Sequence, residues 1–345
     1  MELKKCLNFR NLWIGIAMLW IVFFHGSLEN LSEGLALFKN FGYGGVDICL
    51  FASGIGCYFS LEKDPDILRF LSRRAKRLGP TYLCFIIPWL LWKEWISTMP
   101  FQAVLGNLLG IQTFISWEYH FNWYIGGLVL YYFAMPYLKR LTDSCKNIRQ
   151  DLLAWLCLAV MTISFWNSEN SIVILSRFPV LYSGMVFGKL AKQGYALKGK
   201  DYLVMGFAAL AGVSALLVCQ FKFPALLWNC GFYWYPFALI VPGSCIFFSW
   251  LAEKMEKCKV LRWLKKVLDV VGIYSFELYL IHVFFYEGVM PQILDYLWKI
   301  TVNMQWLMSI PVIILGTFLL NRVAALVSRL LQTKKGSIIN VGVRR

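Results

Sequence analysis

The sequence of 345 residues has little charge and few of the side chains that build soluble catalytic or metal sites. Charged residues make up 15% of it, and only three residues are histidines. Its ten cysteines are scattered, without a C-x-x-C pair or a Cys/His spacing typical of metal ligands. This composition excludes an ordinary soluble domain. It also argues against a disulfide framework, and we expect no metal site.

Acidic residues are scarce as well, with 19 against 34 basic ones, for a net charge of +15. Such a balance is found in nucleic-acid-binding proteins. Here, however, the basic residues form short clusters between apolar runs, and no nucleic-acid-binding motif accompanies them. We therefore exclude a nucleic-acid partner and interpret the clusters as signals of membrane topology.

Long apolar runs are abundant. The chain is 59% hydrophobic, with a mean hydropathy of +0.59, which predicts an integral membrane protein of the all-α class. We expect a polytopic bundle of about ten transmembrane helices. They lie near residues 11–28, 41–61, 79–98, 121–138, 152–168, 173–190, 202–220, 232–252, 269–287 and 305–327. The stretch 101–117 is interrupted by glycines and is expected to be interfacial or re-entrant.

The distribution of positive charge predicts the orientation of these spans. With the N-terminus in the cytoplasm, the inner segments hold 29 of the 34 lysines and arginines. Because cytoplasmic loops carry an excess of these residues, both termini are expected in the cytoplasm and the protein in the plasma membrane. We expect one transmembrane domain over residues 1–331 and a short basic cytoplasmic tail over residues 332–345.

The first apolar run, NLWIGIAMLWIVFFHGS, carries a histidine near its far end. His25 lies roughly 22 Å along the helix axis from Arg10 at about 1.5 Å per residue. An ionisable side chain at that depth usually faces a bundle interior or a wet cavity and often has a chemical role. The alternative is a histidine that is satisfied by a neighbour and serves packing alone.

Asp47, in the expected second span, is deep enough to need a partner. His25 is a natural one, because a carboxylate that accepts from one ring nitrogen leaves the other free to act as a base. Alternatively, Asp47 caps or packs a helix beside the close-approach glycines Gly44, Gly45 and Gly54. The sequence favours neither interpretation over the other.

Polar and aromatic side chains recur at helical spacing in two later spans. Such stripes usually face a cavity, although tyrosines that pack through interhelical hydrogen bonds would produce the same pattern. Their members are Ser275, Tyr279, His282 and Tyr286 in one span, and His120, Tyr124, Gly127 and Tyr131 in the other. All three histidines and Asp47 fall in the outer half of the predicted membrane.

Arginine dominates the cluster RFLSRRAKRLGPTY at the inner face, over residues 69–82. Arg74 and Arg77 are three residues apart and project on nearly the same side of a helix. Paired guanidinium groups suit phosphate oxygens, so a cytosolic phosphate-bearing donor could bind there. The topology signal alone would also account for the cluster.

Five stretches occur in order: FFHGS, GYGGVDICLFASG, FLSRRAKRLGPTYL, HFNWYIGGLVLYYFAMPYL and YSFELYLIHVF. Together they resemble the acyltransferase-3 family of bacterial membrane acyltransferases over essentially the whole chain. The resemblance implies transfer of an acyl group to a hydroxyl of a surface polysaccharide or lipid-linked glycan. The donor in this family is usually acetyl-CoA.

The resemblance also implies roles for single residues. His25 matches the essential histidine of the family's first helix, and Arg74 and Arg77 match its R-x-x-R motif. Where the family commonly has an arginine eleven residues before the histidine, this chain has Ile14. Arg10, one turn earlier, is the residue that could replace it.

A mechanism follows as a hypothesis. Arg74, Arg77 and Arg10 hold the phosphates of acyl-CoA, and His25, oriented by Asp47, deprotonates the acceptor or passes the acyl group on. Side chains of the outer half bind the acceptor: His120, Trp123, Tyr279 and His282. The sequence does not indicate the acceptor, the acyl group or the oligomeric state.

Two other functions remain open at this point. Intramembrane ionisable residues also mark the pathways of transporters and flippases, although the inverted repeats of such proteins are not evident here. The chain could also be a catalytically divergent sensory module, for which Ile14 is the main argument.

Overall fold

The computed structural model describes the chain except for residues 1, 97, 164–168, 224–232, 291–301 and 343–345. In the described part the regular elements are helices, and one isolated antiparallel bridge joins Glu2 to Ala196. The first half contains α1 (Leu3–Cys6), η1 (Leu7–Phe9), α2 (Arg10–His25), α3 (Glu33–Asn40), η2 (Phe41–Gly44), α4 (Gly45–Lys63), α5 (Ile67–Ile96), α6 (Phe101–Leu108), α7 (Gln112–Ile115), α8 (Trp123–Ser144) and α9 (Ile148–Ile163). The second half contains α10 (Glu169–Leu175), α11 (Phe178–Lys192), α12 (Gly199–Lys222), α14 (Tyr235–Met255), α15 (Lys259–Ile273), α16 (Ser275–Val283), the π-helix η3 (Phe284–Val289) and α18 (Val302–Gly342).

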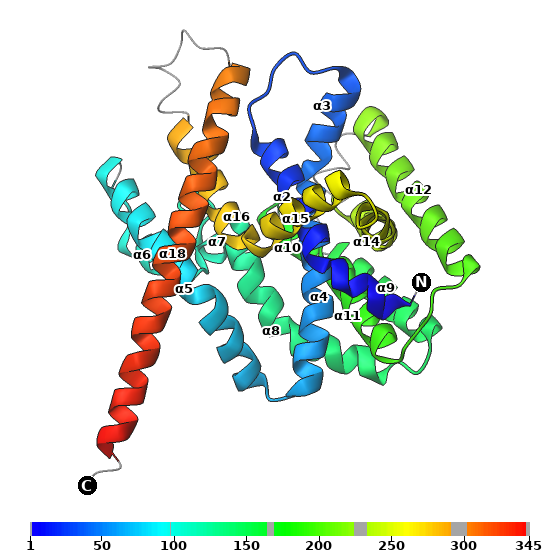
Figure 1. The fold of residues 1–345 in the computed structure, drawn as a ribbon, viewed down its shortest axis with the longest axis horizontal. Coiled ribbons are helices and arrows are strands. Elements are labelled where there is room, and N and C mark those ends of the chain that lie inside the picture. Colours follow the sequence, from blue (N-terminus) through cyan, green and yellow to red (C-terminus); the bar gives the residue numbers. More distant parts are fainter. Residues whose placement is uncertain (1, 97, 164–168, 224–232, 291–301, 343–345) are drawn as a thin grey trace.

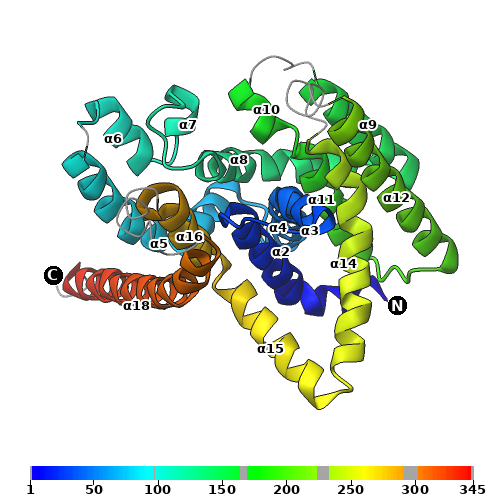
Figure 2. The same ribbon diagram turned by 90° about the horizontal axis from the view of Figure 1, so that it is seen from above.

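Three helices, α2, α4 and α11, lie in the middle of the bundle (Figures 1 and 2). On one side of them stand α5, α6, α16 and α18, and on the other stand α9, α12 and α14. Segments far apart in sequence therefore meet at the centre, where α2 contacts α4, α15 and α16.

Six helical stretches in the described residues are long and apolar enough to cross a membrane. They are Leu3–His25, Glu33–Lys63, Ser171–Lys192, Gly199–Lys222, Tyr235–Met255 and Asn303–Leu330. A seventh is the pair α15 and α16 with η3, if this pair, bent by 71°, counts as one span. The all-helical class and the membrane character are confirmed, whereas ten spans and cytoplasmic termini stay predictions.

Glycines permit the closest helix crossings. A Cβ atom on Gly54 of α4 would lie 2.4 Å from the carbonyl oxygen of Leu181 in α11, and one on Gly184 would lie 2.3 Å from that of Phe51. Small residues let helix backbones approach in this way inside membranes. The close-approach role expected for Gly54 is therefore confirmed.

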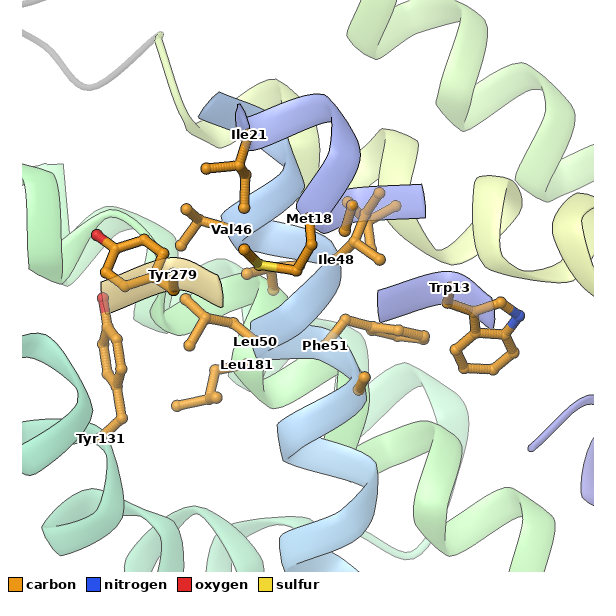
Figure 3. Close-up of a cluster of buried hydrophobic side chains, with 14 of the residues drawn as sticks. Trp13, Met18, Ile21, Val46, Ile48, Leu50, Phe51, Tyr131, Leu181 and Tyr279 are labelled. Atoms are coloured by element: carbon orange, nitrogen blue, oxygen red, sulfur yellow. The ribbon is translucent and has the colours of Figure 1, made fainter. Parts of the chain in front are cut away.

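A second tight crossing joins α2 to α15. A Cβ atom on Gly15 would lie 2.0 Å from the carbonyl oxygen of Leu268, and one on Gly272 would lie 1.9 Å from that of Asn11. Other side chains of α2 face α4 and α16. Figure 3 shows Met18, Ile21 and Val46 gathered with Tyr279 in one apolar cluster.

Candidate active site

A cavity of about 160 Å³ lies among α2, α4, α5, α8 and α16. Arg10 and Ile21, eleven residues apart on α2, both line it. At about 1.5 Å per residue, the cavity therefore follows roughly 16 Å of this helix.

Three arginines contribute to the cavity wall: Arg10 from α2, and Arg74 and Arg77 from α5. The Nε atom of Arg10 donates to the carbonyl oxygen of Ala52 at 3.1 Å. The guanidinium of Arg74 lies over the ring of Phe70, 5.0 Å from its centroid. In the described part of the chain, no carboxylate lies within ion-pair distance of these three guanidinium groups.

This excess of positive charge suits an anionic ligand, since guanidinium groups bind phosphate and carboxylate oxygens through charge-assisted hydrogen bonds. The structure brings the three predicted arginines together in one cavity. Ile14 lines the same cavity. The guanidinium of Arg10 thus enters the space beside the position where the family commonly has an arginine.

His25 lies beyond the other end of this cavity. Its Nδ1 atom is 2.9 Å from the carbonyl oxygen of Ile21 and 3.4 Å from Nε2 of His282. His282, from α16, is completely buried, and its own Nδ1 is 2.8 Å from the carbonyl oxygen of Leu278.

These distances assign the protons on both rings. A carbonyl oxygen only accepts hydrogen bonds, so Nδ1 carries the hydrogen in His282 and in His25. In the neutral rings, Nε2 of His282 then accepts from His25, and Nε2 of His25 keeps a free lone pair. The free nitrogen of His25 faces Glu287, whose Oε1 is 3.6 Å away.

His25 does not line the arginine cavity, although the proposed reaction requires both to act on one donor. Two lining residues, Ile21 and Tyr279, contact the histidine pair. The ring of Tyr279 is 5.5 Å from that of His282, and its hydroxyl donates to the side chain of Asn122. Ile21 and Tyr279 thus adjoin both the cavity and the histidine pair.

The expected pairing of Asp47 with His25 is wrong. Asp47 is 1% exposed, and its Oδ1 atom lies 3.6 Å from Nε of Arg177, which is also 1% exposed. The guanidinium of Arg177 stands 4.5 Å from the ring of Trp123 and 5.4 Å from that of Trp234. A buried ion pair enclosed by aromatic rings is therefore the environment of Asp47.

Of the predicted acceptor-binding residues, Tyr279 and His282 are neighbours, whereas Trp123 and His120 lie in other surroundings. Trp123 belongs to the Arg177 cluster, and Tyr279 lines the arginine cavity. His282 has no exposed surface with which to contact a substrate, and it contacts His25 instead. His120 pairs with Trp117 in the segment before α8, and burial lowers its pKa below the usual range of histidine.

The helical stripes have mixed environments. Ser275, Tyr279 and Tyr124 line the cavity, as expected for a stripe that faces an interior space. Tyr131 instead donates to the carbonyl oxygen of Ile174 at 2.7 Å, and Tyr286 is bonded to Ser309. The packing alternative is thus correct for Tyr131 and Tyr286.

Two residues of interest were absent from the sequence interpretation: Arg177 and Glu287. Arg177 falls within the expected span over residues 173–190, but nothing in its sequence context indicates its buried partner Asp47. Glu287 is missed by regular helical periodicity, because it lies in the π-helix η3. Without knowledge of the π-helix, a carboxylate five residues after an intramembrane histidine does not indicate that the two side chains are close.

A family model described as an acyltransferase domain matches residues 11–322. The match begins one residue after Arg10 and contains the other residues of the cavity and the histidine pair. The chain matches no curated protein and no solved structure.

Proposed function

The chain belongs to the acyltransferase-3 family and is a membrane acyltransferase; we propose that it transfers an acyl group from cytosolic acyl-CoA to a hydroxyl of a cell-surface or lipid-linked glycan. Acetyl is the acyl group to test first, as the family resemblance implies. The proposed location is the plasma membrane, with both chain termini in the cytoplasm.

The observation that carries the proposal is the relation between the two halves of the site. The cavity holds the guanidinium groups of Arg10, Arg74 and Arg77, and its wall at Ile21 and Tyr279 adjoins His25 and His282. The arginines, as an anion site, and His25, as a potential base, thus both lie next to Ile21 and Tyr279. This arrangement supports transfer between substrates that arrive from opposite sides of the membrane.

In the proposed reaction, the arginines hold the phosphates of acyl-CoA, and its thioester passes Ile21 and Tyr279 to reach His25. His25 Nε2, which has the free lone pair, takes the proton of the acceptor hydroxyl. The oxygen then attacks the thioester carbonyl carbon, and the carbon–sulfur bond breaks. The CoA thiolate leaves with the proton that His25 releases, so the ring returns to its neutral form.

Access to His25 supports acceptor entry from the side opposite the cavity. The His25 side chain is 18% exposed, and that of Glu287, which faces its free nitrogen, is 52% exposed. An acceptor hydroxyl could therefore approach Nε2 without passing through the arginine cavity.

The direct test uses membranes of the native host, because they contain the natural acceptor. Membranes with the protein are expected to transfer label from radiolabelled acetyl-CoA to a glycan fraction, and membranes of a deletion strain are not. Mass spectrometry of the surface glycans should show one acyl mass lost in the deletion strain and restored by the gene. Equal labelling with and without the protein, for acetyl and for longer acyl donors, would refute the proposal.

A further inference from the structure

Glu287 is the carboxylate that faces the free nitrogen of His25. In the described residues, no other carboxylate lies within ion-pair distance of His25 or His282. Its Oε1 atom is 3.6 Å from Nε2 of His25, so it can offset a positive charge on this ring. With 52% of its side chain exposed, Glu287 contributes little to packing.

An irregular helix brings Glu287 to this place. In a regular α-helix, five residues turn about 500°, which would leave Glu287 about 140° around the axis from His282. The segment Phe284–Val289 is a π-helix, whose wider turn bonds residues five apart. This wider turn brings Glu287 closer to the side of His282 than a regular α-helix would. One turn of wider helix thus puts the carboxylate on the side of the histidine pair.

π-Helical turns within α-helices are frequent at functional sites, because they cost stability and persist where the altered side-chain direction is useful. Here the altered direction has a specific result. His282 holds Nδ1 of His25, and Glu287 faces Nε2, so both nitrogens of one ring have a neighbour from the same helical segment.

We propose that Glu287 is a positioning residue that stabilises the imidazolium form of His25 during acyl transfer, while the carbonyl oxygen of Ile21 and Nε2 of His282 fix the tautomer that keeps Nε2 of His25 free. This inference rests on the proposed function. When Nε2 takes the hydroxyl proton, His25 becomes positively charged between a neutral His282 and the carboxylate of Glu287. When the thiolate leaves with that proton, the ring is neutral again, and Glu287 has neither gained nor lost a proton.

A second charged group lies near the ring and opposes its protonation. Lys39, from α3, donates to the carbonyl oxygen of Phe24 at 3.1 Å and interacts electrostatically with His25. In the described surroundings, the charged or titratable groups near His25 are thus Lys39, His282 and Glu287. Without Glu287, the remaining charge is positive and opposes protonation of His25.

The test compares Glu287→Gln with wild type in host membranes supplied with radiolabelled acetyl-CoA. Loss of one charge-assisted contact is expected to lower the maximal rate per protein molecule about 10- to 100-fold. The apparent KM for acetyl-CoA should change less than about two-fold, since the arginine cavity is untouched. Glu287→Asp, which keeps the charge, should restore part of the rate.

Glu33→Gln is the matched control, because Glu33 is an exposed glutamate in the first turn of α3. It should behave as wild type. If Glu287→Gln transfers label at the wild-type rate, or if Glu287→Asp is as slow as Glu287→Gln, the assigned role is wrong. If wild type itself transfers no label, the proposed function fails before Glu287 is tested.

Discussion

Arg177 and the three cavity arginines differ in what neutralises their charge. Arg177 has Asp47 beside it and stands close to the ring of Trp123. The guanidinium groups that line the cavity have no such carboxylate among the described residues. A buried charge is costly unless it is paired. We therefore interpret the pairing of Arg177 as structural. Arg10 and Arg74 are half-buried and Arg77 is exposed, so water can solvate their charge, and we interpret them as a site open to an anion.

Replacing Asp47 by alanine should lower the stability of the protein, because Arg177 depends on this partner. The mutation leaves the Arg177 guanidinium buried without its carboxylate, and loss of one partner of a buried pair costs about 3–5 kcal/mol. Asp47→Ala should accordingly melt at a clearly lower temperature in detergent. Asp64→Ala, which removes the partner of Arg73 at the surface, should melt nearly as wild type does. A fully stable Asp47→Ala protein without activity would instead support the catalytic role first expected for Asp47.

For single residues, the sequence predicts the position of a side chain on its own helix more reliably than the side chain that it contacts. The depth of His25 and the arginine spacing at Arg74 and Arg77 follow from helix geometry within one segment. The partner of Asp47 depends on how α4 meets the start of α11, where Arg177 lies, and no local pattern determines that meeting. Side chains from distant segments are brought together only by tertiary packing.

The helical elements show where periodicity is a good guide and where it fails. In α16 the spacing of Ser275 and Tyr279 predicts that both face one interior space, and both line the cavity. Two irregularities flank this helix: the 71° bend from α15 and the π-helix η3. A single period applied across the whole of 269–287 misses both, and with them the direction of Glu287.

The crossing of α2 and α15 is the element-scale feature most sensitive to a small substitution. In Gly15→Ala the new Cβ would lie 2.0 Å from the backbone oxygen of Leu268, so the helices must separate. Overpacking of this kind costs about 1–3 kcal/mol or more. Because α2 carries both Arg10 and His25, acyl transfer should fall together with the melting temperature.

Gly206→Ala in α12 is the control for that variant, since no atom lies within 4 Å of the added Cβ. Its melting temperature and its rate of acyl transfer should match those of wild type. A Gly15→Ala protein that is also unchanged in both respects would contradict the described contact between α2 and α15.

For the whole molecule, hydropathy correctly predicts an all-helical membrane protein, and the five sequence stretches correctly indicate its family. The arrangement of the site was predicted only in part. The arginines do share a cavity, but Ile21 and Tyr279 stand between that cavity and His25. The depth of each residue along its predicted span does not reveal such a wall, because the wall depends on how α2 and α16 are rotated against each other.

The wall suggests two separate entrances, one for the donor at the arginines and one for the acceptor at His25. Binding of the donor and its reaction should then depend on different residues. This separation distinguishes the proposed transmembrane transfer site from a pocket in which one set of residues binds the donor and also reacts with it.

The measurement that tests it most directly follows labelled acetyl-CoA binding and label transfer for two variants in host membranes. Arg74→Ala with Arg77→Ala should weaken donor binding at least about 10-fold, because each loses a charge-assisted contact. His25→Ala should bind the donor as wild type does and transfer no label. A His25→Ala protein that still transfers label at the full rate would contradict the account.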